Sequence, residues 1–382
     1  MASGAGLQDV VAAETSISDI DGRLGKLMYA GYDVKDLAAH SSFEEVVYLV
    51  HHLELPNLAQ LEELRAQLAK ERDLHDFTKQ LLVTLANTAS PMSMLRTIVS
   101  AESAHDPDGW ESVTNDEANL RKSIRLVARF PQMIGGYHRL RNGHWPVEPS
   151  PDLTHAGNML YVLTGKIPSD EDARILDICL VLHADHTMNA STFAARVTAA
   201  TLSDIHSAMT SAIATLKGSL HGGANERVFA MLSRIDNMDA VEADIKGRLA
   251  RKELIMGFGH RVYKTEDPRA TVLRELARDL AARKGDPKWF DMSERIYEIV
   301  RDQKGLYPNV DFYAAAVYHY LGIPTELFTT VFAASRISGW TAHAREQFSN
   351  NRLIRPDSDY TGPPPRLYQK LAEREAGTGT KV

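Results

Sequence analysis

The sequence has 382 residues, of which 44% are hydrophobic and 24% are charged, so it can bury a sizeable core and is not a disordered chain. Asp and Glu (50) outnumber Lys and Arg (43), and the net charge of −7 argues against a nucleic-acid-binding surface while leaving room for a local basic pocket. Cys179 is the single cysteine, which excludes an intramolecular disulfide and a cysteine-rich zinc site.

Length and apolar patterning limit further the class of protein that the sequence can encode. The length fits one large domain or two. Residues 1–22 lack a cationic start followed by an apolar run, so we expect no secretory signal. No apolar stretch reaches the ~18 residues that cross a bilayer. We therefore expect a cytoplasmic protein.

The first part of the chain predicts a short hairpin followed by helices. Residues 16–34 contain the turn-forming pairs Asp21-Gly22 and Gly31-Tyr32, which indicate a hairpin. Residues 58–77 then place leucines at helical spacing with charges between them.

Helical patterns continue to the end of the chain. Residues 176–186 are apolar on all sides, as in a buried helix, and 271–284 again spaces its leucines helically. A further helix is expected over 325–347, after Pro324. Residues 362–382 begin with three prolines and predict an extended arm. Since strands and helices do not alternate, we predict a mainly α-helical fold.

One candidate site segment reads KGSLHGGANE, from Lys217 to Glu226. His221 precedes two glycines and a helical pattern, so it is expected near a helix N-terminus, where the dipole disfavours the charged imidazole. A neutral imidazole there can donate a hydrogen bond to a developing oxyanion. A glycine-rich turn with a capping histidine explains the same residues equally well.

A second segment reads MGFGHRVYKTEDPR, from Met256 to Arg269. Two glycines precede His260, and Arg261 and Lys264 add positive charge, so the segment suits an anionic ligand. It lacks the spacing of a P-loop or a dinucleotide fingerprint. The alternative is a turn before a solvated helix.

Two further patterns involve an aspartate and a histidine pair. Asp311, in PNVDFY, is either a helix N-cap or a partly desolvated general base with a raised pKa. His183 and His186 lie three residues apart, a spacing that on a helix could suggest metal ligation. Because no third ligand has a recognisable spacing, we predict no metal site.

Together, these segments resemble the citrate synthase family. GFGHRVYKTEDPR matches the active-site signature of that family, and LHADHTMNASTFAARV, GSLHGGANE, YPNVDFY and SRISGWTAHAREQ occur in the family's order. IDGRLGKLMYAGYDVKDLA is similar to its N-terminal hairpin, and NNRLIRPDSDYTGP to its C-terminal arm. The resemblance covers essentially the whole chain and is closest to the short bacterial and archaeal type.

The resemblance implies an architecture. It is a mainly α, two-domain, all-helical homodimer with a small N-terminal hairpin. A large domain of residues 1–223 and 323–382 would include the C-terminal arm, and a small domain would span 224–322. The active site would lie in the cleft between them and close over oxaloacetate.

The resemblance also implies catalytic roles. His221 would hydrogen-bond the thioester oxygen of acetyl-CoA, Asp311 would remove a methyl proton, and His260 would polarise and protonate the ketone of oxaloacetate. Citryl-CoA would then be hydrolysed to citrate and CoA. A thioester methyl is a weak acid, so a carboxylate alone is insufficient and needs an oxyanion donor in a closed site.

Binding residues follow by the same resemblance. Oxaloacetate would be held by His186, Arg269, Arg336 and Arg355, the last contributed to the neighbouring subunit. CoA, a cosubstrate rather than a permanently bound cofactor, would contact Lys264, Lys304, Met256, Gly257, Phe258 and Gly259. His183 and Val310 stand where the related 2-methylcitrate synthases tend to carry Tyr and Leu, which favours acetyl-CoA over propionyl-CoA.

Alternatives to this interpretation remain. One is 2-methylcitrate synthase or a dual-specificity enzyme, because one methylene is worth only about 1–3 kcal/mol of discrimination. Another is a non-catalytic helical binding module, since fold alone does not determine function. A third is a metal-dependent hydrolase built on His183 and His186, which a chelator would inactivate.

Overall fold

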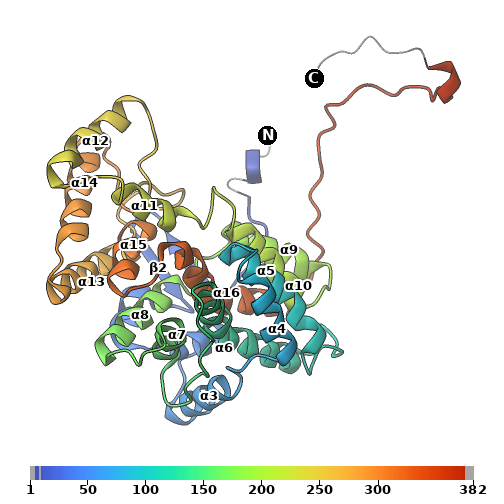
Figure 1. Cartoon of the computed structure of the whole chain (residues 1–382). Helices are drawn as coiled ribbons and strands as arrows, with labels where there is room; N and C mark the ends of the chain where they lie inside the picture. Colours follow the sequence, from blue (N-terminus) through green and yellow to red (C-terminus); the bar gives the residue numbers. More distant parts are fainter. Residues whose placement is uncertain (1–4, 8–9, 375–382) are drawn as a thin grey trace.

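The computed structural model describes residues 5–7 and 10–374. Within these residues it contains sixteen α-helices and one small sheet, which confirms the predicted mainly α-helical class (Figure 1). The α-helices are α1 (Val34–His40), α2 (Phe43–His52), α3 (Leu58–Lys70), α4 (Asp76–Leu85), α5 (Pro91–Glu102), α6 (Asp116–Arg141), α7 (His155–Thr164), α8 (Asp170–His183), α9 (Ala190–Ala200), α10 (Ile205–Leu216), α11 (Ala224–Leu232), α12 (Met238–Ala250), α13 (Pro268–Lys284), α14 (Lys288–Lys304), α15 (Val310–Tyr320) and α16 (Phe328–Ser349). Short 3-10 turns lie at Ala5–Leu7, Ser103–His105, Thr325–Leu327 and Leu371–Glu373.

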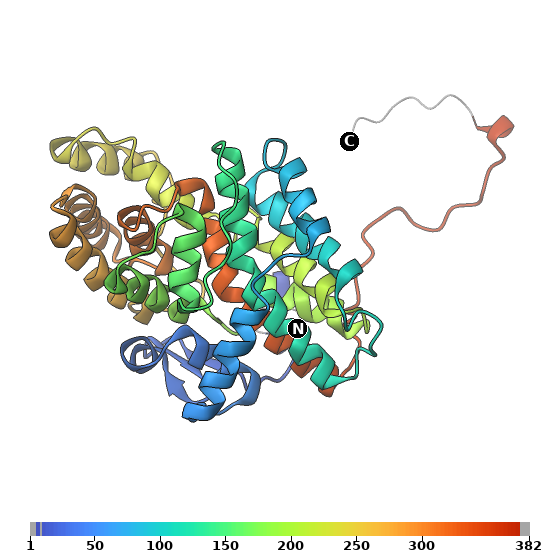
Figure 2. The same ribbon diagram turned by 60° about the horizontal axis from the view of Figure 1, so that its bottom comes forward.

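The predicted hairpin is confirmed. Strands β1 (Ser18–Asp21), β2 (Lys26–Tyr29) and β3 (Tyr32–Asp33) form an antiparallel sheet in that order. The Asp21 carboxylate accepts hydrogen bonds from the backbone N–H groups of Arg23 and Leu24, both at 2.9 Å, and so shapes the first turn. The sheet lies at the base of the molecule in Figure 2.

Two predicted helices begin or end differently from the expectation. The pattern over 58–77 is two helices, because the chain leaves α3 after Lys70 and α4 begins at Asp76. Between them, Arg72 points into the core, where it donates to the carbonyls of Ser150 and Leu153. The helix expected over 325–347 begins with a 3-10 turn at Thr325, and α16 follows from Phe328.

Helix α16 forms the centre of the fold (Figure 1). It packs on α6, α8 and α9, and its Arg336 and Trp340 are among the largest fully buried side chains. On the left of Figure 1, α12 packs with α14, and α13 and α11 pack with α15. The predicted division at 224–322 stays a prediction.

The chain leaves the body after α16. Residues 350–370 contain no helix or strand. Those up to Pro356 still lie against the body, and the chain after them extends away from the helices, as the sequence predicts for the end of the chain (Figures 1 and 2). Residues 375–382 of the predicted arm lie outside the described residues. No helix among the residues described has the length and apolarity that a bilayer crossing requires.

Candidate active site

Two loops that carry predicted site residues are joined by backbone hydrogen bonds. The Gly259 N–H donates to the Tyr307 carbonyl at 3.0 Å, and the Asn309 N–H donates to the Gly257 carbonyl at 2.8 Å. Gly257 has φ 82°, and a Cβ atom there would lie 2.9 Å from Phe312 Cβ. Glycine is therefore required for this close approach, which links the loop before His260 to the start of α15.

Asp311 lies in the first turn of α15 but does not cap it. Asn309 takes the cap and accepts a hydrogen bond from the Asp311 N–H at 3.1 Å, so the N-cap interpretation of Asp311 is wrong. Asp311 Oδ1 is buried and has no hydrogen-bond partner among the described residues. Burial raises the pKa of Asp311 to about 7, although Arg269 and Arg336 oppose the shift. Asp311 has the properties of a general base that works near neutral pH.

His260 presents its Nε2–H to the site. Its Nδ1 accepts hydrogen bonds from the backbone N–H groups of Val262 at 3.0 Å and Tyr263 at 3.1 Å, so in the neutral ring the proton is on Nε2. Burial, helped by Arg269, lowers the pKa of His260 to about 4. The ring is therefore a neutral hydrogen-bond donor at physiological pH.

His221 carries its proton on Nδ1, the opposite nitrogen to His260, because Nε2 is occupied by Ser191. It lies in the turn before α11, where Gly223 holds the cap position and no side chain caps the helix, so the capping interpretation is wrong. Its Nε2 accepts from the Ser191 N–H at 3.3 Å and lies 2.8 Å from Ser191 Oγ, to which Trp340 donates at 3.1 Å. The proton is therefore on Nδ1. Burial and Arg336 lower the pKa of His221 to about 4.

Two buried guanidinium groups supply positive charge beside Asp311. Arg269 forms a paired contact with Asp267, with Nε–Oδ1 at 2.9 Å and a second N–O distance of 2.7 Å. Arg336 donates from Nε to the His183 carbonyl at 2.6 Å, and one of its terminal nitrogens has no partner among the described residues. Burial lowers the pKa of Arg336 to about 10, so it stays charged at neutral pH. Such forks bind carboxylates in a bidentate manner.

His186 completes this polar group. It is 8% exposed, and its ring centroid lies 5.3 Å from that of His260 and 5.7 Å from that of Tyr263. Burial and Arg269 hold the pKa of His186 well below its usual value, so the ring is neutral. His186 Nε2 and the Tyr263 hydroxyl are buried and unpaired among the described residues. Because native proteins pair nearly all buried polar groups, several unpaired ones together indicate a polar ligand.

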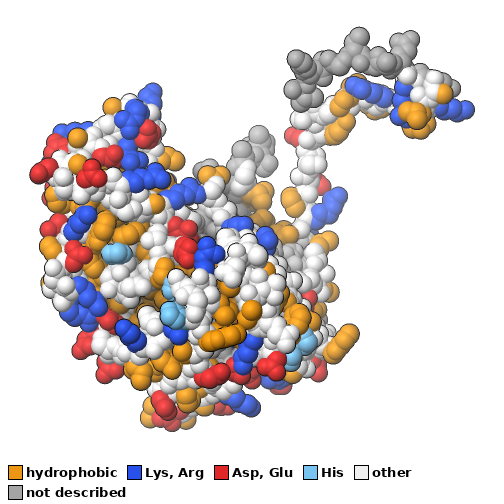
Figure 3. Space-filling model, viewed as in Figure 1, with side chains coloured by type: hydrophobic (Ala, Val, Ile, Leu, Met, Phe, Trp, Pro, Cys, Tyr) orange, Lys and Arg blue, Asp and Glu red, His pale blue; other side chains and the backbone are white. Residues whose placement is uncertain are grey.

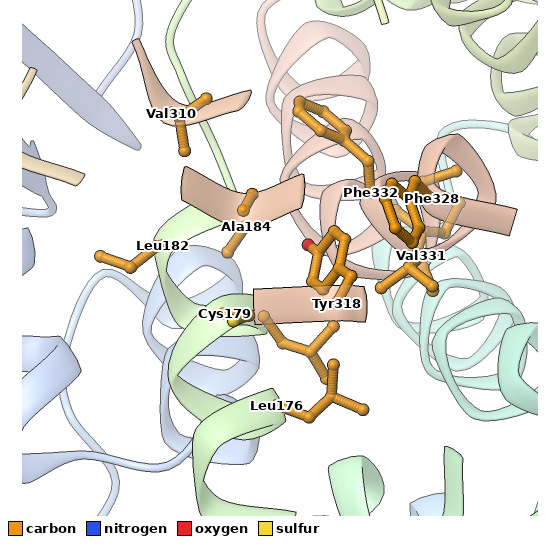
Figure 4. Packing of buried hydrophobic residues seen from close by; sticks show 14 of the residues in the cluster. Leu176, Cys179, Leu182, Ala184, Val310, Tyr318, Phe328, Val331 and Phe332 are labelled. Carbon is orange, nitrogen blue, oxygen red and sulfur yellow. The ribbon is translucent and has the colours of Figure 1, made fainter. Parts of the chain in front are cut away.

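The predicted acyl-specificity residues lie at the last position of α8, His183, and at the first position of α15, Val310. His183 is fully buried, and its Nδ1 lies 2.7 Å from the Cys179 carbonyl, so Nδ1 carries the proton. Its ring meets Phe332 edge-on at 4.9 Å. Figure 4 shows Val310, Phe332 and Tyr318 around this helix end. The side chains named here are apolar apart from the His183 imidazole and the Tyr318 hydroxyl.

The remaining predicted residues are exposed or lie elsewhere. Lys264 and Lys304 are exposed on the surface, and Met256 and Phe258 alternate with Gly257 and Gly259 in the loop before His260. The side chain of Arg355 is 76% exposed and contacts Asp357. Arg355 lines a cavity of ≈ 810 Å³ with residues 12–16 and the end of α16, so the structure does not bring it to the other site residues within this chain.

Sequence reasoning missed four residues that support the site. Tyr263 and Asp267 lie inside the MGFGHRVYKTEDPR segment, so that motif is the signal that could have found them. Ser191 and Trp340, which fix the His221 ring, come from α9 and α16 and have no local signal. No group of three or more His, Cys, Asp or Glu side chains in residues 5–7 and 10–374 is arranged to hold a metal ion.

The fold and site define a class of protein. A carboxylate of raised pKa and two neutral imidazole donors lie with two buried guanidinium groups in a mainly α-helical fold. This is the arrangement of an enzyme that removes a proton from carbon and stabilises the resulting enolate next to a bound anion.

Comparisons with known proteins agree with this class. The family model described as "Citrate synthase, C-terminal domain" matches residues 6–357. Citrate synthase 2 of Bacillus subtilis is 48% identical over 98% of this chain and 100% of its own, and a citrate synthase of Haloferax volcanii is 49% identical over 94% and 95%. A 2-methylcitrate synthase of Shewanella oneidensis is 41% identical over 97% and 98%.

A solved structure gives the same result. Citrate synthase of Thermoplasma acidophilum, in a ternary complex with carboxymethyl coenzyme A and oxaloacetate, is 32% identical, with a TM-score of 0.90 over 97% of this chain and 98% of that chain. The chain belongs to the citrate synthase family and is therefore an acyltransferase.

Proposed function

We propose that this enzyme condenses acetyl-CoA with oxaloacetate and hydrolyses the resulting citryl-CoA to citrate and CoA, the entry step of the tricarboxylic acid cycle. The observation that supports the proposal is the protonation state of three side chains, namely one carboxylate that can accept a proton and two imidazoles that can donate one. Asp311 has a raised pKa and an oxygen without a partner among the described residues, whereas His221 and His260 are neutral rings whose N–H groups donate to none of the described residues. The site thus has one proton acceptor and two donors.

The chemistry follows from these groups. Asp311 takes a proton from the acetyl methyl group, while the His221 Nδ1–H stabilises the enolate oxygen that forms. The enolate carbon attacks the ketone carbon of oxaloacetate, and His260 Nε2–H protonates the ketone oxygen as the carbon–carbon bond forms. Water then attacks the thioester of citryl-CoA, the carbon–sulfur bond breaks, and the CoA sulfur leaves as the thiol.

Substrate binding is proposed for the positive side of the site. Arg269, Arg336 and His186 would hold the two carboxylates of oxaloacetate, because both guanidinium groups are buried beside the site and both Arg336 and His186 keep a buried nitrogen without a partner among the described residues. Lys264, Lys304 and the backbone from Met256 to Gly259 would hold CoA. No permanently bound cofactor is proposed.

A homodimer with a shared site is also part of the proposal. Arg355 is exposed and far from the other binding residues within its own chain, so we propose that it reaches the site of a neighbouring subunit. Residues 224–322 are proposed to close over bound oxaloacetate, and the enzyme is proposed to be cytoplasmic.

The second candidate is 2-methylcitrate synthase activity. A relative with that name is 41% identical to this chain. His183 and Val310 favour acetyl-CoA, because they differ from the Tyr and Leu typical of that branch. One methylene is worth only about 1–3 kcal/mol of discrimination, so the preference for acetyl-CoA would be modest.

The test is the initial rate of CoA release with oxaloacetate and either acetyl-CoA or propionyl-CoA, in the presence of EDTA. We expect a clearly higher kcat/KM for acetyl-CoA. A preference for propionyl-CoA would move the enzyme to the methylcitrate branch, and no release with either thioester would contradict the proposal. Activity lost to the chelator would support a metal-dependent hydrolase.

A further inference from the structure

The turn that follows His186 is held in a strained conformation. Thr187 has φ 49°, in the left-handed region that β-branched residues rarely adopt. Its N–H donates to Asp185 Oδ2 at 3.1 Å, and its carbonyl accepts from the backbone and side-chain N–H groups of Asn189 at 2.9 and 3.2 Å. Both backbone polar groups of Thr187 are therefore fixed, and the direction of the preceding His186 ring depends on them.

Asp185 is the anchor of this turn. It is fully buried, and its Oδ2 also accepts a hydrogen bond from the Ser18 hydroxyl. Helix α16 approaches it closely at Gly339, whose N–H donates to the Ala184 carbonyl at 3.2 Å. A methyl group at Gly339 would overlap the Asp185 carboxylate. The absence of a side chain at Gly339 therefore leaves the space that the Asp185 carboxylate occupies.

His343, one turn further along α16, is oriented to donate to Asp185. Its Nε2 lies 3.2 Å from Asp185 Oδ2, and both side chains are completely buried. Its Nδ1 lies 3.2 Å from a guanidinium nitrogen of Arg196. A guanidinium group only donates, so Nδ1 accepts and Nε2 carries the proton.

Arg196 is itself fixed at the far end of the network. It contacts Glu346 at 2.6 Å and Gln347 at 3.0 Å, both in α16. Glu346 also accepts the Ser16 N–H at 2.7 Å. A continuous chain of hydrogen bonds therefore connects the segment before β1 to the turn beside His186.

We propose that Asp185 and His343 are positioning residues for oxaloacetate binding, which hold the strained Thr187 turn so that the His186 imidazole faces His260 and Arg269. This inference rests on the proposed role of His186 in binding oxaloacetate. Neither residue touches the reacting atoms, and each acts through the backbone of Thr187.

The test uses the full-length enzyme and measures kcat and the KM of each substrate. His343→Leu removes the donor, and we expect the KM for oxaloacetate to rise about tenfold while the KM for acetyl-CoA changes less than about threefold. His343→Gln can still donate from its amide and should stay within about threefold of the wild type. His155→Leu is the matched control, because His155 is equally buried, with both ring nitrogens unpaired among the described residues.

A double variant separates positioning from general loss of packing. Asn tolerates the left-handed conformation better than Thr, so Thr187→Asn added to His343→Leu should recover at least about a third of the lost oxaloacetate affinity. An unchanged oxaloacetate KM in a folded His343→Leu variant would overturn the inference. The same conclusion would follow if His343→Gln were as impaired as His343→Leu, or if the double variant recovered nothing.

Two further measurements keep the test decisive. If His343→Leu does not fold, Asp185→Asn replaces it, since the amide keeps the shape but presents N–H towards the donors, and the oxaloacetate KM should again rise. An unchanged KM there also refutes the positioning role. A wild-type enzyme that releases no CoA with oxaloacetate would instead refute the proposed function, so the two failures are distinguishable.

Discussion

At the scale of single residues, the site depends on which ring nitrogen carries a proton. Backbone N–H groups occupy Nδ1 of His260, whereas Ser191 occupies Nε2 of His221. The protein therefore leaves one donor on each ring for a substrate oxygen. Burial keeps both rings neutral, because it lowers the pKa of each to about 4.

The pKa values predict the pH dependence of the reaction. Asp311 must be ionised to accept a proton, and its pKa is about 7. We therefore expect kcat/KM for acetyl-CoA, which reports the free enzyme, to rise with pH through a single transition near neutrality and to show no second transition down to about pH 5, because the two histidines titrate lower. Initial rates at limiting substrate concentrations across this range test the prediction. A rate that falls as pH rises through neutrality would contradict it.

The three residues proposed to carry the chemistry, His221, His260 and Asp311, are assigned from the resemblance to a family whose motifs contain them. Their local sequence alone also fits a capped turn, a solvated helix start or a helix N-cap. The residues that orient them were not predictable, because Ser191 and Trp340 are brought together only by the packing of α9 on α16. Hydrogen-bond partners from distant segments leave no periodic trace in the sequence.

At the scale of elements, the N-terminal hairpin supports the loop that carries His260. The Lys264 N–H donates to the Gly22 carbonyl at 2.8 Å. A methyl group at Gly22 would overlap the Val262 carbonyl oxygen. A Cβ atom at Gly25 would lie 2.8 Å from the Glu266 carbonyl oxygen. The turn needs glycines because two backbones meet there.

A substitution at this contact should impair catalysis more than stability. Gly22→Ala is expected to push the loop of residues 260–266 away from the hairpin and lower kcat/KM by about tenfold or more. Gly247→Ala is the control, because its nearest neighbour is the end of the flexible Arg251 side chain at 3.2 Å. Steady-state kinetics and thermal unfolding of both variants test this. Wild-type kcat/KM in Gly22→Ala would show that the contact does not hold the loop.

The junction of α2 and α8 predicts a pH effect on stability. Asp177 accepts the Phe43 N–H at 3.0 Å and contacts Arg174 at 2.7 Å. Burial, followed by the charge of Glu44, raises the pKa of Asp177 to about 6. The Asp177 carboxyl group therefore binds a proton more tightly in the folded state than in the unfolded state. Protonation of Asp177 stabilises the fold at low pH, and this stabilisation is lost as pH rises from about 4 through about 6.

Asp177→Asn removes that loss while keeping an acceptor for Phe43. We expect the variant to be about 1–2 kcal/mol more stable than the wild type at about pH 8 and to show a smaller difference at about pH 5. Urea unfolding at the two pH values measures this. A difference that is larger at the lower pH would contradict the assigned pKa.

The Leu58–Phe77 pattern illustrates the limits of prediction at this scale. Periodicity located the helical region but missed its interruption, because the buried contacts of Arg72 with Ser150 and Leu153 form between distant parts of the chain. By contrast, the hairpin was predictable, because turn-forming pairs such as Asp21-Gly22 are a local signal in the sequence.

At the scale of the whole molecule, the C-terminal arm exposes apolar side chains that nothing in the described part of a single chain covers. Tyr360, Leu367 and Tyr368 are 78%, 96% and 83% exposed, and Figure 3 shows hydrophobic side chains along the arm. Exposed apolar side chains on an extended segment are typical of an interface. We therefore expect the arm to be covered in the proposed homodimer.

Subunit mixing tests whether Arg355 crosses to the neighbouring site. Arg355→Ala and Asp311→Asn should each be nearly inactive alone. Random exchange makes half of the dimers mixed, and each has one site with both residues intact, so about a quarter of wild-type activity should return. No recovery after demonstrated subunit exchange would contradict the crossing.

The most direct test of the account is Asp311→Asn, studied by steady-state rates and by oxaloacetate binding. The amide cannot accept the methyl proton, so we predict that kcat falls by about a thousandfold or more, while the dissociation constant for oxaloacetate changes by less than about threefold. A folded Asp311→Asn enzyme with near-normal turnover would contradict the assignment of Asp311 as the base, and with it the proposed mechanism.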